Sequence, residues 1–269
     1  MFSDRLLNLL AQQGDAPDYP RLAAEVLGIR GAPPALARKL VEQAILLTDW
    51  REHWRQVGER AIQGAPHAPG VYRFLDRAGT VLYVGKAANL RRRLAAHFAE
   101  RKWKALPPAL ARVVTVECEV LGSELEALLR EAALIRELRP VVNIQTATPS
   151  LETRAIAGSL VRDTVLLLPS VDPDAAEVVA ARTDGATMLR SVRRAGSEGL
   201  ARELWAFFSR TVDVANDGSA PLVFSWLAGR GQRTTRLDPH DFASARDLGN
   251  RMDELLADRD LFTERVVRL

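Results

Sequence analysis

The sequence predicts an α+β protein in which a small domain, a three-stranded antiparallel sheet flanked by helices, lies between an N-terminal helical region and a C-terminal α+β domain. Three observations predict this class. Residues 1–62 place apolar residues at helical spacing. Residues 63–146 contain two β-rich runs around a short turn, and later helices with clear start signals. After a linker at 147–160, a new succession of strand and helix patterns fills residues 161–269.

The composition excludes several classes of protein. One cysteine, Cys118, leaves no intrachain disulfide and is typical of a reducing cytoplasm. Four scattered histidines and that cysteine cannot build a Cys/His zinc site. No apolar run is long enough to span a bilayer, and residues 1–15 lack the pattern of a signal peptide. We therefore expect a cytoplasmic protein with no membrane partner.

Positive charge is concentrated around the small domain. The net charge of the chain is only +3, but residues 66–146 hold 13 Lys and Arg against 8 Asp and Glu. A local basic excess favours a polyanion as partner. The residues that would form this DNA-binding surface are Arg91, Arg92, Arg101, Lys102 and Lys104.

The N-terminal region predicts helices at 3–10, 20–27, 34–47 and 49–61, with a break in the Asp- and Pro-rich stretch 15–20. The stretch GIRGAPPALARKL resembles a helix-hairpin-helix DNA-binding turn, with Gly31 and Ala37 suitably spaced. However, Pro33 stands where that motif wants its second glycine, and proline has no N–H to offer a phosphate. This favours plain helix packing over DNA contact.

The two β-rich runs, VYRFL and TVLYV, predict a hairpin around the turn Asp76–Gly79. If Leu75 pairs with Thr80, then Tyr72 lies directly opposite Tyr83. Cross-strand partners share one face of a sheet, so the two rings would stand side by side. An aromatic pair that only stabilises the hairpin is the alternative to a functional pair.

A basic helix follows the hairpin. Asn89 is a good N-cap for LRRRLAAHFAER, and Leu90, Leu94 and Phe98 form its buried stripe. Arg93 borders this stripe, whereas Arg91 and Arg92 point further out. A solvated basic face is one interpretation of the three arginines, and phosphate contact is the favoured one.

Residues 113–120 alternate as a third strand, and Ser123 and Glu126 form a capping box that begins another helix. Its expected apolar face is Leu125, Leu128, Leu129, Ala132 and Ile135, with Glu131 at the edge. A half-buried carboxylate needs a partner. An ion pair with Arg130 or Arg136 and a divalent metal ion remain equal alternatives for Glu131. Pro140 ends the helix, and Asn143 follows.

The C-terminal region predicts strands in DTVLLLPS, AEVVAART and ATMLRSV, a helix in EGLARELWAFFSRTV, a hairpin in PLVFSWLAGRG and TTRLDP, and a closing helix at 239–257. We find no catalytic constellation in it. Asp163, Asp172 and Asp174 are interpreted as turn residues.

The stretch Pro69–Asn143 resembles the GIY-YIG nuclease superfamily. The resemblance rests on Gly70-Val71-Tyr72 and Tyr83-Val84-Gly85, the arginine-rich helix, the glutamate and the final asparagine, in that order. Within the superfamily it is most similar to the N-terminal incision domain of UvrC-type excinucleases and their shorter Cho-like relatives. The resemblance implies a metal-dependent DNA endonuclease that makes a single incision in nucleotide excision repair, with DNA and a damage-recognition complex as candidate partners.

The resemblance also implies roles for individual residues. The tyrosine that activates water is Tyr83, and Tyr72 is the tyrosine of the first tripeptide. Arg93 would contact the phosphate, and Lys86 is the lysine after the second tripeptide. Glu131 would hold Mg²⁺ or Mn²⁺, and Asn143 would close the site.

The sequence departs from the family pattern in places. Valine replaces isoleucine in both tripeptides, and Ala133 stands where many UvrC-type sequences have asparagine. We recognise no later UvrC module, which favours a Cho-like, single-incision enzyme or a GIY-YIG protein related to those fused to proofreading-type exonucleases. A catalytically weak or inactive DNA-binding or repair-scaffold protein is an alternative, although the retained site residues argue against it. A mobile-element or defence nuclease is another.

Overall fold

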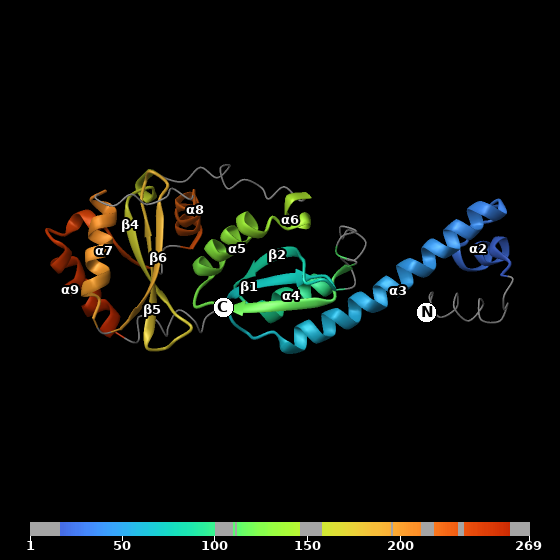
Figure 1. Cartoon of the computed structure of the whole chain (residues 1–269), viewed down its shortest axis with the longest axis horizontal. Helices are drawn as coiled ribbons and strands as arrows, with labels where there is room; N and C mark the ends of the chain where they lie inside the picture. Colours follow the sequence, from blue (N-terminus) through green and yellow to red (C-terminus); the bar gives the residue numbers. More distant parts are fainter. Residues whose placement is uncertain are drawn as a thin grey trace.

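The computed structural model describes residues 17–99, 110, 112–145, 158–194, 196–210, 218–230 and 234–258, with the backbone alone at 45–51, 144, 145, 159 and 230. The helix expected at 3–10, most of the linker, and Arg101, Lys102 and Lys104 lie outside the described residues. Figure 1 shows two sheets beside each other and a long helix that extends away from the first. No helix among the described residues is both long and apolar enough to cross a membrane.

The N-terminal region holds two helices, α2 (Tyr19–Leu27) and α3 (Pro34–Gly64). The two separate helices predicted at 34–47 and 49–61 are wrong, because α3 runs through the junction. Neither proline nor glycine stands at residues 48 and 49 to interrupt it. Leu22 and Val26 of α2 pack with Val41 of α3, and Figure 1 shows α2 and the beginning of α3 standing away from both sheets.

The turn between α2 and α3 is formed by glycines but offers little to a phosphate. Gly28 and Gly31 adopt positive φ angles of 70° and 75°, which glycine tolerates without strain. Pro33 is the N-cap of α3 and Pro34 its first residue, and neither has an N–H to donate. This geometry favours the packing interpretation of the turn.

The first sheet is three-stranded and antiparallel, as predicted, and its strand order is β2-β1-β3. Its strands are β1 (Gly70–Leu75), β2 (Val81–Ala87) and β3 (Thr115–Val120). The predicted register is wrong by two residues, because Tyr72 lies opposite Gly85 and not opposite Tyr83. A shift of two residues keeps the same side of the strand, so both tyrosines still share a face.

The register shift arises at the hairpin turn. Asp76 donates its backbone N–H to the carbonyl of Thr80, and its side-chain Oδ1 accepts the N–H groups of Ala78 and Thr80. A bulge then separates Phe74 from Leu75 in the pairing with β2. Together the short turn and the bulge move β2 along β1.

Helices cover both faces of the first sheet: α4 (Leu90–Phe98) with the end of α3 on one, and α5 (Glu124–Leu138) on the other, followed by α6 (Val141–Gln145). The start signals are confirmed. Asn89 Oδ1 accepts the N–H of Arg92 at 2.9 Å, and Ser123 Oγ accepts the N–H of Glu126 at 3.1 Å. The stripe Leu90, Leu94 and Phe98 is buried, as predicted.

The second sheet is antiparallel with the order β6-β5-β4-β7. Its strands are β4 (Thr164–Pro169), β5 (Ala175–Ala181), β6 (Thr187–Arg193) and β7 (Thr235–Leu237). The first three strands and helix α7 (Glu198–Phe208) are confirmed. The 239–257 segment is divided into η6 (Pro239–Asp241) and α9 (Ala245–Ala257), and α7 and α9 pack on one face of this sheet.

The hairpin predicted at 221–239 is wrong in its first half, which forms helix α8 (Ala220–Arg230). This helix lies between the second sheet and α5, where its Val223, Phe224 and Leu227 are buried. A helix with partners on several sides is apolar on several sides, and this hides its 3.6-residue period.

Helix α5 lies between the two sheets (Figure 1). Ala127 and Leu134 pack on the first sheet. Leu125 and Leu129 belong instead to a buried cluster with the second sheet and α8. Leu125, Leu128 and Leu129 of the predicted apolar face therefore pack on the C-terminal part of the chain, whereas Ile135 of that face packs on the first sheet. Glu131 lies one turn from Ala127 and from Leu134, on the side of the helix toward the first sheet.

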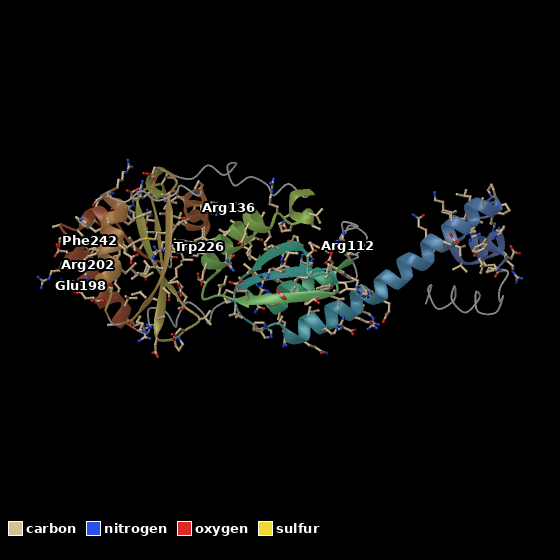
Figure 2. The ribbon with its side chains drawn as sticks, in the orientation of Figure 1. Arg112, Arg136, Glu198, Arg202, Trp226 and Phe242 are labelled. Atoms are coloured by element: carbon tan, nitrogen blue, oxygen red, sulfur yellow. The ribbon has the colours of Figure 1, made fainter. Side chains whose placement is uncertain are left out.

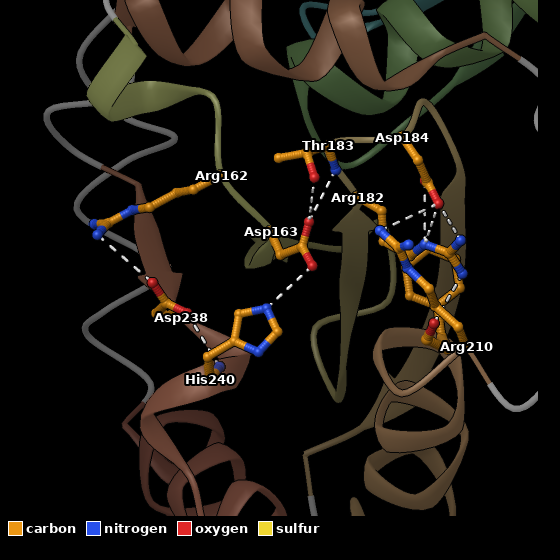
Figure 3. A network of polar contacts seen from close by, with 9 residues as sticks. Arg162, Asp163, Arg182, Thr183, Asp184, Arg210, Asp238 and His240 are labelled. Carbon is orange, nitrogen blue, oxygen red and sulfur yellow. Dashed lines mark hydrogen bonds and ion pairs between the residues drawn. The ribbon is translucent and has the colours of Figure 1, made fainter.

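Polar contacts connect the ends of the C-terminal elements, as Figure 3 shows. Asp163 Oδ1 accepts the N–H and the hydroxyl of Thr183, and its Oδ2 lies 3.1 Å from Nε2 of His240. Asp184 pairs with Arg182 and Arg210. Asp163, which precedes β4, therefore connects the turn between β5 and β6 to η6. This is more than the turn role expected for it.

Candidate active site

The structure brings five of the predicted site residues together around strand β2. Tyr72 lies on β1, Tyr83 and Lys86 on β2, Arg93 on α4 and Glu131 on α5. In the sheet order β2-β1-β3, β2 has one open edge. Open edges carry backbone groups without a strand partner, and the site is built against this one.

Two glycines allow the strands and rings to come together. A Cβ on Gly70 would lie 2.2 Å from the backbone oxygen of Glu119 on the neighbouring strand. A Cβ on Gly85 would lie 2.5 Å from the ring and the hydroxyl of Tyr72. No side chain fits at either distance, so each tripeptide needs its glycine for close approach.

Tyr72 and Tyr83 form an aromatic pair with ring centroids 5.9 Å apart and an interplanar angle of 49°. Tyr72 is fully buried, whereas Tyr83 is partly exposed. Burial raises the pKa of the Tyr72 hydroxyl far above its ordinary value, and Tyr83 raises it further, although Arg93 acts in the opposite direction. Tyr72 thus stays protonated at any ordinary pH, and the hydroxyl closer to solvent is that of Tyr83.

Arg93 reaches back from α4 to the tyrosines. Its Nε donates to the Tyr72 hydroxyl at 3.4 Å. The pKa of Arg93 is raised, first by Tyr72 and then by Tyr83, against the effect of burial. The charge of Arg93 also lowers the pKa of Glu131, so this guanidinium acts on both the aromatic pair and the carboxylate.

His97 is a site residue that the sequence reasoning missed. Its ring lies edge-on to three aromatic rings, with centroid distances of 5.8 Å to Tyr72, 5.3 Å to Phe74 and 5.5 Å to Tyr83. The available signal was its position one helical turn after Arg93, which places both side chains on one face of α4.

Arg91 has a structural role that the sequence reasoning missed. Its Nε donates to the carbonyls of Ile62 and Ala65, and its Nη2 donates to the carbonyl of Gln63. These acceptors are at the end of α3, where carbonyls lack helical partners. Arg91 therefore ties α4 to α3, and its contact with phosphate stays a prediction. Arg92, by contrast, is exposed.

Glu131 faces the open edge of β2, where its Oε1 accepts the backbone N–H of Lys86 at 2.9 Å. Burial raises the pKa of this carboxyl, and the charges of Lys86 and Arg93 act against that rise. The two ion-pair partners considered for Glu131 are engaged elsewhere, since Arg130 binds Glu119 and Arg136 donates to Ser219. The structure therefore does not support that alternative.

The surroundings of Glu131 fit a divalent metal ion. The carboxylate is half-buried and bound to a backbone N–H, so a cation would stabilise its charged form. Among the described residues no group of three or more His, Cys, Asp or Glu gathers as a metal site, which leaves Glu131 as a single-carboxylate ligand. Mg²⁺ keeps several waters and binds readily through one or two carboxylates.

Lys86 contributes both its backbone and its side chain. Its Nζ lies 3.5 Å from Oε1 of Glu124, at the start of the helix that carries Glu131. Its backbone N–H holds Glu131. The lysine therefore connects β2 to α5 at two points.

The side-chain amide of Asn143 forms hydrogen bonds to the backbone of the edge strand β2, as a neighbouring strand would. Its Oδ1 accepts the N–H of Val84 at 2.8 Å, and its Nδ2 donates to the carbonyl of Val84 at 2.9 Å. Val84 and Lys86 are successive outward-facing positions of the edge strand. Asn143 and Glu131 thus occupy neighbouring places on the same edge, and Asn143 is a positioning residue.

Asn143→Ala is expected to lower the free energy of unfolding by about 1–3 kcal/mol, because it leaves the N–H and C=O of the buried Val84 without partners. Urea denaturation measures this loss, and hydrogen exchange should show faster exchange at Val84. Asn143→Asp keeps the acceptor and loses the donor, so its free energy of unfolding should lie between those of wild type and Asn143→Ala. Unchanged exchange at Val84 in the Ala variant would contradict the assignment.

Comparison with known proteins places this site in a family. Residues 68–144 match the family model described as the UvrC-like GIY-YIG domain. The UvrABC system protein C of Legionella pneumophila is 48% identical over 80 residues, which cover 29% of this chain and 13% of that protein. The protein of the same name from Nitrobacter winogradskyi is 37% identical over 137 residues, covering 50% of this chain and 16% of the relative.

Among solved structures, the chain is similar to the N-terminal endonuclease domain of UvrC from Thermotoga maritima with magnesium, at 34% identity and a TM-score of 0.29. The match covers 32% of this chain and 94% of that domain. The chain thus spans about one eighth of the length of the first curated relatives, and the likeness is confined to one segment.

Proposed function

We propose, from the UvrC-like GIY-YIG domain formed by residues 68–144, that the chain is a metal-dependent endonuclease that hydrolyses a DNA phosphodiester and makes a single incision in nucleotide excision repair. The observation that carries the proposal is the half-buried Glu131 on the β2 edge, with Arg93 and the two tyrosines beside it. The presence of one matched nuclease segment supports one cut for each bound duplex.

The residues divide the work of hydrolysis. Tyr83, with its partly exposed hydroxyl, positions a water and takes part in moving its proton. Tyr72 stays protonated and orients Arg93, whose guanidinium neutralises the phosphate. His97 fixes the ring pair from the side. Glu131 holds Mg²⁺ or Mn²⁺, which when bound supplies a Lewis acid that polarises the phosphate.

The partners follow from the relatives. Their shared name assigns them to the UvrABC system, and we extend this to the chain as a proposal that it works beside a damage-recognition complex. The proposed DNA-binding surface is formed by Arg91, Arg92, Arg101, Lys102 and Lys104.

A nicking assay tests the proposal. Supercoiled plasmid and a duplex with one bulky adduct are incubated with the protein and Mg²⁺ or Mn²⁺, with and without EDTA and a damage-recognition complex. We expect metal-dependent nicks, and one cut near the adduct. A well-folded protein that binds DNA but never nicks it under any of these conditions overturns the proposal in favour of a DNA-binding scaffold.

DNA binding should depend steeply on salt, because each phosphate contact contributes about 0.9 to the slope of log K against log salt. Arg92→Ala should reduce that slope by about 0.9. Arg202→Ala is the matched control, since Arg202 is exposed on the far side of the C-terminal domain (Figure 2). Fluorescence anisotropy at several salt concentrations measures both. Equal slopes for wild type and Arg92→Ala would remove Arg92 from the surface.

A further inference from the structure

Helix α5, which carries Glu131, packs against the C-terminal domain on the side away from the first sheet. We propose that this domain is a positioning element of the metal site, which fixes α5 and thereby sets how tightly Glu131 binds a divalent cation. The inference rests on the proposed function, because it assumes that Glu131 is the metal ligand.

The two faces of α5 differ in what they can anchor. The face toward the first sheet presents Ala127, Glu131 and Leu134. Ile135 also packs against this sheet, so a few apolar side chains hold this face around the charged Glu131. The opposite face presents Leu125 and Leu129, which are 0% and 9% exposed in the cluster with the second sheet. The C-terminal domain therefore supplies a second set of buried apolar contacts to α5, separate from those of the first sheet.

The beginning of α5 touches the C-terminal domain at backbone distance. A Cβ on Gly122 would lie 2.1 Å from the carbonyl oxygen of Pro169 and 2.6 Å from Cα of Ser170. Gly122 directly precedes Ser123, the N-cap of α5. Its φ angle is outside the left-handed range, so close approach to the end of β4 is what requires glycine here.

The far end of α5 and its middle are also attached. Arg136 Nη2 donates to the hydroxyl of Ser219, just before α8, at 3.2 Å. Trp226 of α8 packs against the shared cluster, and Figure 2 shows it beside α5. The C-terminal domain therefore contacts the helix at its start, along its length and near its end.

A displacement of α5 would reach the metal ligand directly. Glu131 lies nine residues after Gly122, about 13 Å along the axis of one rigid helix. Its Oε1 must stay within hydrogen-bond distance of the Lys86 N–H, now 2.9 Å. A site held by a single carboxylate depends closely on where that carboxylate lies, so small shifts should change metal affinity.

The test compares Gly122→Ala with Gly199→Ala in the full-length protein. Gly199 lies in α7, and a Cβ there meets no heavy atom within 4 Å. Calorimetric titration with Mn²⁺ alone measures affinity without activity, and nicking at increasing Mn²⁺ gives the half-saturating concentration and kcat. We expect Gly122→Ala to bind Mn²⁺ about 10-fold more weakly, with kcat largely recovered at saturating Mn²⁺, and Gly199→Ala to match wild type.

A second pair guards against misfolding of the first variant. Phe224→Leu truncates a residue of the cluster shared with α5, and Phe207→Leu truncates an equally buried residue on the opposite face of the same sheet. Only Phe224→Leu should weaken Mn²⁺ binding, even if both lower the melting temperature.

The outcomes separate this inference from the proposed function. A wild-type protein that binds no Mn²⁺ overturns the metal site, and this inference with it. If wild type binds Mn²⁺, and folded Gly122→Ala and Phe224→Leu bind it equally well, the metal site stands and the positioning role is refuted.

Discussion

Glu131→Gln is expected to reduce metal-dependent nicking by about 10²–10³-fold or more, with the fold intact. Glutamine keeps an oxygen that can accept the Lys86 N–H but removes the charge that would hold the cation. Single-turnover cleavage with increasing Mn²⁺ measures the loss, and circular dichroism checks the fold. Affinity for DNA should survive, because the proposed phosphate contacts come from other residues.

The matched control is Glu126→Gln on the same helix. Glu126 is also half-buried, burial also raises its pKa, and its Oε2 accepts the N–H of Gly122. It lies away from Arg93 and the tyrosines, so its loss should leave the nicking rate within about 3-fold of wild type. A folded Glu131→Gln protein that nicks at the wild-type rate would contradict the assignment of Glu131 as the metal ligand.

Tyr83→Phe should lower the rate of cleavage by about 10²-fold or more, because its hydroxyl takes part in proton transfer from water. The ring packing is preserved, so stability should change little. Tyr72→Phe should cost less, since the buried Tyr72 hydroxyl acts through Arg93 and stays protonated. Rates at saturating DNA and Mn²⁺ separate these effects from binding.

The third tyrosine of the chain is the control for this pair. Tyr19 lies on α2, where the guanidinium of Arg38 stands over its ring, far from the β2 edge. Tyr19→Phe should cleave at the wild-type rate. A Tyr83→Phe protein that is faster than Tyr72→Phe would reverse the two roles.

Local signals in the sequence were sufficient for the parts of the site that depend on neighbours in the chain. The caps at Asn89 and Ser123 predicted where α4 and α5 begin, because a side chain binds an N–H three residues away. The buried stripe of α4 was predicted from the helical spacing of its apolar residues, which recur every four positions. The two tyrosines were placed on one face correctly, although the wrong residues were paired.

The errors have a common physical origin, which is competition between distant partners. The bulge beside Phe74 depends on how the Asp76 turn closes, and a period of two cannot detect it. Both faces of α5 have partners, so its apolar residues could not indicate which sheet each face meets. The contacts of Arg91 were missed because its acceptors, the last carbonyls of α3, are remote in sequence.

Leu125, Leu128 and Leu129 pack on the C-terminal sheet and on α8. The GIY-YIG segment therefore cannot be moved into another protein without changes to its surface. A recombinant chain that ends near residue 146 would expose these leucines to solvent as a hydrophobic patch, which favours self-association. A transplant into another protein would need polar replacements across that patch. Natural relatives that carry the same segment in a different context face the same requirement, and the residues that face outward from this helix are where their sequences should differ most from this one.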